Sequence, residues 1–180
     1  MNNILSKIAP INKDNTINIF IEISKESKNK YELDKKSGLI KLDRVLYSAQ
    51  SYPFDYGFLP NTLWKDGDPI DVVLLSSYPI MPGVLVEGRV VACLNMIDNN
   101  ESDIKIIAVV DKDPRFSNIN DLKDINIHTI DEIKHFFETY KILEKKEVKI
   151  PDVFDKNKAI ELIKESINIF KKKSKVKKSK

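Results

Sequence analysis

The chain is poor in cysteine, and Cys93 is the only one among 180 residues. A single cysteine excludes an intrachain disulfide and is typical of a protein from a reducing compartment. The neighbouring residues Val91, Ala92 and Leu94 are apolar. We therefore expect a buried and unreactive thiol instead of a catalytic nucleophile.

Long apolar runs are also absent from the sequence. No stretch approaches the ~20 apolar residues of a membrane-spanning helix, and residues 1–15 hold no sustained apolar segment of the kind found in signal peptides. There are no internal repeats or long linkers. A chain of this length, 42% hydrophobic and 32% charged, is expected to form one soluble domain, and the cytoplasm is its predicted location.

Acidic residues are missing from the last ten positions, 171–180, which hold seven lysines. The rest of the chain has 23 basic and 27 acidic residues, so the overall charge of +3 hides a body of charge −4. With few large apolar side chains, this segment predicts a disordered tail after a domain at residues 1–170. The tail is either simply solvated or makes weak electrostatic contacts with nucleic acid or an anionic surface.

Segments of alternating polarity predict strands along the first two thirds of the chain. The clearest is residues 17–23, in which isoleucine occupies every second position. Turn residues such as those of Pro82–Gly83 separate the expected strands. These strands cover residues 17–23, 30–34, 39–46, 70–75, 84–97 and 104–110.

The last third of the chain changes to helical spacing. Ile133 and Phe137 belong to a predicted helix that Thr129 or Asp131 could cap, and a second helix is expected from about residue 155 to 170. Short strands followed by helices indicate an α+β fold. We predict a small, closed β-barrel with the helices packed outside it.

The segment Asp66–Val72, DGDPIDV, is the most specific feature of the sequence. It places the carboxylates of Asp66, Asp68 and Asp71 within six residues, where like charges repel each other unless a cation lies among them. Oxygen ligands of this kind suit a hard cation such as Mg²⁺. The EF-hand pattern is excluded, because Ile70 and Asp71 occupy its fifth and sixth positions.

Strand alternation places further ionisable groups on shared faces. Lys30 and Glu32 project from one face of their strand and Tyr31 from the other, and Asp103 and Lys105 also share a face. Carboxylates beside lysine and arginine suit a polyanion that arrives with metal ions, because the acids hold Mg²⁺ and the cations hold phosphate oxygens. Such a site allows in-line displacement at phosphorus by a metal-activated water.

Together these motifs resemble those of family I soluble inorganic pyrophosphatases. DGDPIDV is accompanied by KYELD, LDRVL, YPFDYGFLP, DIK and HFFETYK, and the resemblance extends from about residue 15 to residue 165. It implies a five-stranded OB-like barrel with flanking helices and Mg²⁺-dependent hydrolysis of pyrophosphate to two phosphates. It also implies a cytoplasmic homohexamer if the source is bacterial.

The resemblance further implies roles for individual residues. Asp68 would orient and deprotonate the attacking water as the catalytic base. Several Mg²⁺ ions would be held by Asp66, Asp71, Asp98 and Asp103, with Asp71 bridging two of them. Phosphate oxygens would be bound by Lys30, Arg44, Tyr56, Lys105, Tyr140 and Lys141. The polar lining would be completed by Glu22, Glu32 and Tyr52.

Some features depart from the family pattern. Where the family usually has a second acid after Asp98, this chain has Asn99, which can contact a metal or a water but adds no charge. The loop 98–103 lacks the glycine commonly found there, and the lysine-rich tail lies outside the pattern. The asparagine bears on the affinity for the outermost, substrate-delivered metal rather than on the reaction itself.

The residues alone leave other interpretations open. A small barrel can bind single-stranded nucleic acid, although the acidic body and the interleaved charges oppose a basic binding stripe. A hydrolase of longer polyphosphates or nucleotides is a nearer rival, although the sequence shows no nucleobase pocket. Tyr140 lies on the apolar stripe of its helix and could be a core residue, with Lys141 directed about 100° away from it. His128 and His135 are expected to be capping, core or subunit-contact residues instead of ligands.

Overall fold

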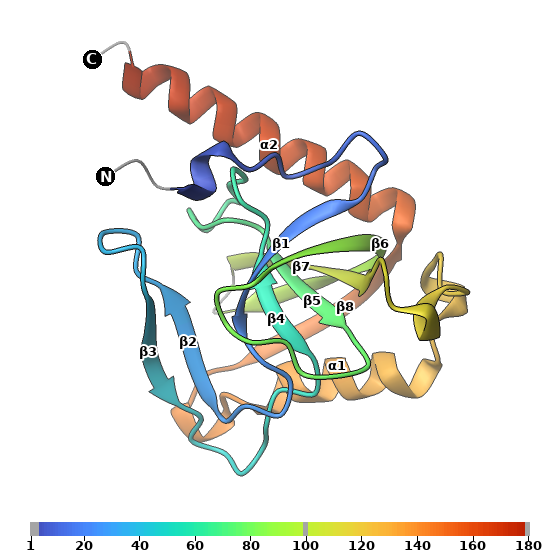
Figure 1. Cartoon of the computed structure of the whole chain (residues 1–180). Helices are drawn as coiled ribbons and strands as arrows, with labels where there is room; N and C mark the ends of the chain where they lie inside the picture. The colour runs from blue at the N-terminus through green and yellow to red at the C-terminus, as the bar shows by residue number, and fades with distance from the viewer. Residues whose placement is uncertain (1–3, 99–100, 179–180) are drawn as a thin grey trace.

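The computed structural model describes residues 4–98 and 101–178 of the chain, and the strands of this part form a closed ring (Figure 1). The ring is closed because β6 pairs with β1 as well as with β7. All its pairings are antiparallel except that of β5 with β7. In order around the ring the strands are β1 (Ile17–Ile23), β4 (Asp55–Phe58), β5 (Asp71–Leu75), β7 (Glu101–Val110) and β6 (Leu85–Asp98). The predicted α+β fold with a closed, five-stranded, OB-like sheet is thus confirmed.

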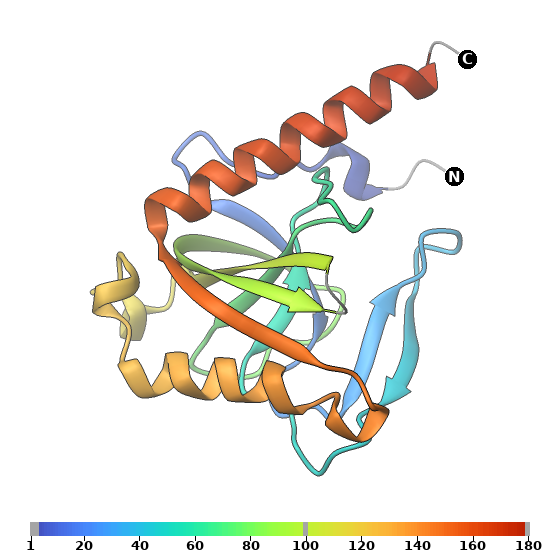
Figure 2. The same cartoon turned by 180° about the vertical axis from the view of Figure 1, so that it is seen from behind.

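The remaining elements lie around this ring. A two-stranded hairpin, β2 (Asn29–Leu33) and β3 (Ile40–Val45), stands at one side of it, and β8 (Val148–Asp155) pairs with β6 on the outside. Figure 2 shows β8 running between the two helices, α1 (Ile127–Thr139) and α2 (Lys156–Lys178). Short 3-10 helices cover Ile4–Lys7, Pro114–Phe116, Leu122–Asp124 and Ile142–Glu144.

Alternate residues of the strands pack into two different clusters. On β5, Val73 packs in a cluster that includes Ile133 and Phe137 of α1, whereas Val72 packs in a second cluster that includes Leu162 and Ile163 of α2. Successive side chains of a strand point to opposite faces, so each helix covers a different face of the ring strands. This two-sided packing holds the strand ends that carry the predicted site.

The bounds of the six predicted strands agree with the structure to within one residue, except that β7 begins three residues earlier, at Glu101. The helix ends differ from the predicted ones. The N-cap of α1 is Asn126, whose side chain accepts a hydrogen bond from the backbone of His128, so the prediction of Thr129 or Asp131 as the cap was wrong. Helix α2 continues past residue 170 to Lys178, through most of the segment for which we expected a disordered tail. Residues 156–178 contain no glycine or proline, and lysine is a good helix former, so the sequence offers no stop signal there.

Two strands, β4 and β8, have no counterpart among the predicted ones. All four residues of β4 are buried, which removes the alternation that marks a strand. Gly57 is required in it, because a Cβ atom at this position would lie 1.9 Å from the carbonyl oxygen of Phe20 on β1. None of the described helices is long and apolar enough to span a membrane.

Candidate active site

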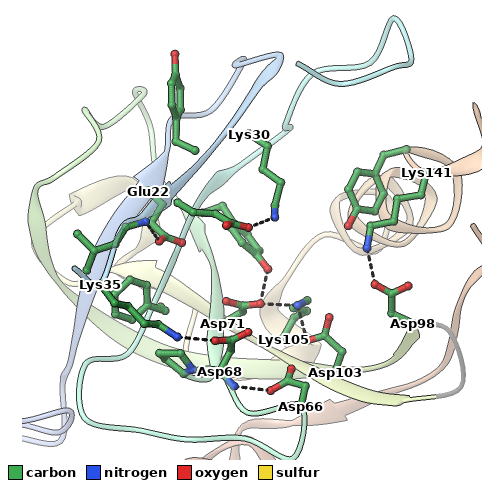
Figure 3. A pocket seen from close by; sticks show the side chains of 17 residues that line it. Glu22, Lys30, Lys35, Asp66, Asp68, Asp71, Asp98, Asp103, Lys105 and Lys141 are labelled. Carbon is green, nitrogen blue, oxygen red and sulfur yellow. Dashed lines mark hydrogen bonds and ion pairs between the residues drawn. The ribbon is translucent and has the colours of Figure 1, made fainter. Parts of the chain in front are cut away.

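One pocket of about 290 Å³ opens between the β2–β3 hairpin and the rim of the ring. Its walls come from β1, from β2 and the turn that follows it, from β4, from the DGDPIDV segment, from the end of β6, from β7 and from the residues that directly follow α1 (Figure 3). It gathers twelve of the fourteen predicted site residues, namely Glu22, Lys30, Glu32, Tyr56, Asp66, Asp68, Asp71, Asp98, Asp103, Lys105, Tyr140 and Lys141. Residues far apart in sequence therefore meet in one place, as the motifs predicted.

The two predicted residues outside the pocket lining are Arg44 and Tyr52. Arg44 is paired with Lys30 across the hairpin, and its guanidinium Nε donates to Glu144 Oε1 at 2.9 Å. Tyr52 is 1% exposed, and its ring centroid lies 5.9 Å from that of Tyr56, so it supports the pocket wall from behind. Their predicted parts in phosphate binding and in the polar lining stay predictions.

A buried lysine forms the centre of the pocket floor. The parallel register of β5 and β7 puts Lys105 beside Asp71, and its Nζ lies 2.5 Å from Asp71 Oδ2 and 2.5 Å from Asp103 Oδ1. The contact with Asp103 confirms that these residues share a strand face, while Ile104 turns into the core. Burial alone would lower the pKa of Lys105, but the charges of Asp71 and Asp103 more than reverse this and raise it.

Tyr56 extends this polar group from β4. Its hydroxyl donates to Asp71 Oδ2 at 2.6 Å. Burial and the nearby charge of Asp71 raise the pKa of the Tyr56 phenol well above its usual value. The phenol therefore stays protonated and is available as a hydrogen-bond donor.

The DGDPIDV segment forms a compact turn at the mouth of the pocket. The backbone N–H of Asp68 donates to Asp66 Oδ1 at 3.0 Å, and its carbonyl accepts from the backbone of Trp64 at 2.7 Å. The Asp68 carboxylate is 69% exposed and faces Lys35, whose Nζ lies 2.7 Å from Asp68 Oδ1. Sequence reasoning missed Lys35, because a turn side chain has no strand periodicity to fix its direction.

The far wall of the pocket carries another acid and base pair. Lys141 forms an ion pair with Asp98, as Figure 3 shows. Tyr140 lines the pocket and also stacks on Phe136 with ring centroids 5.0 Å apart, so it serves the wall and the core together. Asn99, which departs from the family pattern, lies outside the described residues.

Strand β2 contributes both of its faces to the pocket. The ion pair of Lys30 with Glu32 confirms that these two side chains share one face. Tyr31 lines the pocket too, although it also packs against the core as its opposite face requires. Strands β2 and β3 form a sheet of their own at the rim, so side chains from both faces of β2 can reach the same pocket.

The donor set fits a hard divalent cation. Burial raises the pKa of the Asp66 and Asp103 carboxyls, and each is raised further by the charge of Asp71. These three carboxylates are thus close enough to repel each other, and carboxylate oxygens are ligands that suit a hard cation. Within residues 4–98 and 101–178, no three acidic, histidine or cysteine side chains stand near enough to share one ion. Asp71 and Asp103 instead contact the ammonium of Lys105, and Asp66 accepts a hydrogen bond from the backbone N–H of Asp68.

Glu22 supports the same pocket from β1. Its Oε1 accepts a hydrogen bond from the backbone N–H of Leu33 at 2.6 Å. Burial raises the pKa of the Glu22 carboxyl to about 8, although the Leu33 hydrogen bond acts in the opposite direction. Its ionisation is therefore unfavourable in the metal-free folded protein.

Replacing Glu22 with glutamine should stabilise the metal-free protein at alkaline pH. The pKa is raised above its unfolded value, so stability of the wild type should fall as pH rises from about 4.5 to about 8. Glu22→Gln keeps an oxygen that can accept the hydrogen bond from Leu33, and it should abolish most of this pH-dependent loss of stability. The variant should then exceed the wild type by roughly 4 kcal/mol in free energy of unfolding where Glu22 of the wild type is fully ionised. Urea unfolding in EDTA between pH 5 and 9 measures this free energy.

The matched control is Glu147→Gln, at a residue whose side chain is 77% exposed. That variant should show the wild-type pH dependence of the free energy of unfolding. Equal pH dependence in all three proteins would contradict a raised pKa at Glu22.

Comparison with known proteins agrees with this geometry. The family described as inorganic pyrophosphatase matches residues 19–171. An inorganic pyrophosphatase of Halalkalibacterium halodurans is 48% identical over 155 residues, which cover 86% of this chain and 95% of that protein. One of Helicobacter pylori is 47% identical over 169 residues, covering 92% and 98%. The crystal structure of the inorganic pyrophosphatase from Thermus thermophilus superimposes with a TM-score of 0.89 at 45% identity, covering 93% of this chain and 98% of that one.

The fold and the family match therefore define a hydrolase that acts on a phosphoric anhydride. More specifically, this chain belongs to the inorganic pyrophosphatase family. Hydrolysis of pyrophosphate is the activity of that family, which is generally metal-dependent.

Proposed function

We propose that this pocket hydrolyses pyrophosphate to two orthophosphates with Mg²⁺, by direct attack of a water that Asp68 deprotonates. The observation that carries the proposal is the convergence of carboxylates and lysines in one hollow. Acids alone would repel a diphosphate, and lysines alone would hold no metal. The alternation of the two charges suits a substrate that enters together with cations.

Four carboxylates are proposed to hold the metal ions. They are Asp66, Asp71, Asp98 and Asp103, and the family resemblance would give Asp71 the bridging part among them. When bound, Mg²⁺ neutralises phosphate charge and lowers the pKa of water. Asn99 carries no charge and is a weaker metal ligand than a carboxylate, so it is proposed to affect only the affinity for the outermost ion.

The remaining side chains are assigned to the proton and the phosphate. Asp68 is exposed at the pocket mouth, where its carboxylate can take a proton from water and fix the direction of attack. Lys30, Lys105 and Lys141 bring positive charge toward the phosphate oxygens. Tyr56 and Tyr140 add phenolic donors. Arg44, which is paired with Lys30 across the hairpin, is also assigned to phosphate oxygens. Charge that develops on the leaving phosphate is stabilised by these groups without a covalent enzyme intermediate.

The cellular location, the oligomeric state and the domain bounds are proposed as well. A cytoplasmic homohexamer agrees with the family resemblance, and exposed apolar side chains such as Tyr47, Tyr78 and Met81 offer surface that copies of the chain could cover. The family match ends at residue 171, which supports a catalytic domain at residues 1–170.

Phosphate release from pyrophosphate tests this function directly. Release should require Mg²⁺, stop with excess EDTA, and stop with Ca²⁺, because the longer and looser coordination shell of Ca²⁺ misplaces the water. Activity in EDTA, or full activity with Ca²⁺, would contradict the proposal. Tripolyphosphate and ATP in the same assay separate pyrophosphatase activity from hydrolysis of longer chains and nucleotides.

A further inference from the structure

The turn of the β2–β3 hairpin carries Lys35, a pocket residue to which the resemblance gives no role. Its ammonium points across the pocket mouth to the carboxylate of Asp68, with Nζ and Oδ1 2.7 Å apart (Figure 3). We propose that Lys35 is a further substrate-binding residue, which exchanges its ion pair with Asp68 for a phosphate oxygen of the entering diphosphate. This inference rests on the function proposed above.

The hairpin fixes the backbone from which Lys35 reaches. The carboxylate of Asp34 accepts hydrogen bonds from the backbone N–H of Ser37 at 2.9 Å and from its hydroxyl at 2.6 Å. Gly38 closes the turn at a φ of +75°, a conformation that favours glycine. At the base of the turn, Leu33 and Ile40 pack against the cluster that contains Phe20 and Phe58. The Cα of Lys35 is therefore held at the pocket rim, while its long side chain can swing.

Lys35 differs from the other pocket lysines in exposure. Its side chain is 66% exposed, against 22% for Lys30, 12% for Lys141 and 4% for Lys105. Each of the three less exposed lysines forms an ion pair with an acid inside the pocket. An exposed ion pair such as that of Lys35 with Asp68 stabilises a protein only weakly, so it can be exchanged at small cost.

The charge of the pocket side chains explains how this exchange would help the pocket to bind an anionic substrate. Seven of the lining side chains are acidic and four are lysines, so the side chains by themselves present net negative charge to an incoming diphosphate. A cation on a long side chain at the rim raises the local concentration of such an anion and contacts it first. When Lys35 moves to phosphate, the carboxylate of Asp68 is released for the attacking water. Substrate capture is therefore coupled to freeing the proposed base.

The test compares Lys35→Ala with Lys36→Ala in the Mg²⁺-dependent phosphate-release assay. Lys36 is the next residue of the same turn and does not line the pocket, although both lysines line a groove along the hairpin. Its removal changes the net charge equally. Lys35→Ala should lower kcat/KM about 3- to 10-fold through a higher KM, with kcat changed less than about twofold. Lys36→Ala should change both constants by less than about twofold. Lys35→Arg, which keeps the charge, should recover most of kcat/KM.

Ionic strength provides a second readout. The difference between wild type and Lys35→Ala should shrink as salt rises from about 0.05 to 0.5 M, since exposed charges are screened. Equal kinetics of the two alanine variants would overturn the role of Lys35, and so would a fall in the kcat of Lys35→Ala with KM unchanged. In either case, an active wild type would still support the proposed function. An inactive wild type would overturn both.

Discussion

Asp68→Asn should lower kcat for pyrophosphate hydrolysis by about 10²- to 10⁴-fold, the contribution expected from a general base. The substitution removes the proton acceptor but keeps the size of the side chain. It should leave the turn intact, because the bonds that Asp68 makes to Asp66 and Trp64 use its backbone. Steady-state phosphate release measures the loss, and calorimetric titration with Mg²⁺ should show nearly unchanged metal binding.

The matched control for this variant is Asp131→Asn, at an exposed position on α1. It removes one carboxylate without touching the pocket and should keep wild-type kcat. Near-wild-type turnover of Asp68→Asn would reject the assignment of Asp68 as the base. Loss of Mg²⁺ binding in that variant would instead make Asp68 a metal ligand.

Lys105→Met should reduce the free energy of unfolding of the metal-free protein by about 3–5 kcal/mol, the usual cost of removing one partner from a buried ion pair. Methionine preserves the length of the buried stem. The ammonium that lies between Asp71 and Asp103 is lost, and two carboxylates are left facing each other. Urea unfolding at pH 8 in EDTA measures the cost.

Magnesium should restore part of the stability that Lys105→Met loses. This response distinguishes a metal site from a purely structural ion pair. A divalent cation restores positive charge among the same acids, so Mg²⁺ should stabilise Lys105→Met more than it stabilises the wild type. Lys158→Met, at an exposed lysine paired with Glu161 on α2, should change stability by less than about 1 kcal/mol. Equal stabilisation of variant and wild type by Mg²⁺ would contradict a shared cation site at Asp71 and Asp103.

Much of the fold could be predicted because its strands carry a regular pattern. The isoleucines of β1 alternate over the whole strand, and its predicted bounds match the structure. Strand β4 could not be found in this way, because its four residues are buried on both faces and the alternation disappears. Strand β8 contains Pro151, and the lysines at the end of α2 give no signal that separates a helix from a solvated tail.

The candidate site was predictable where strand parity fixes the direction of a side chain. Asp103 and Lys105 are two residues apart on β7, so their contact follows from the period of a strand. That Asp71 joins them depends on the parallel pairing of β5 with β7, which no local pattern encodes. Lys35 lies in a turn, where side-chain direction depends on tertiary contacts alone.

In the proposed mechanism, the aspartates of one pocket hold divalent ions together with a diphosphate. An anomalous difference map from crystals grown with Mn²⁺ and imidodiphosphate, a non-hydrolysable analogue, tests it most directly. Metal peaks are expected within coordination distance of Asp66, Asp71 and Asp103, two of them sharing Asp71, and the analogue is expected beside Lys30 and Lys141. An empty pocket, or metal and analogue bound at separate places on the surface, would contradict it.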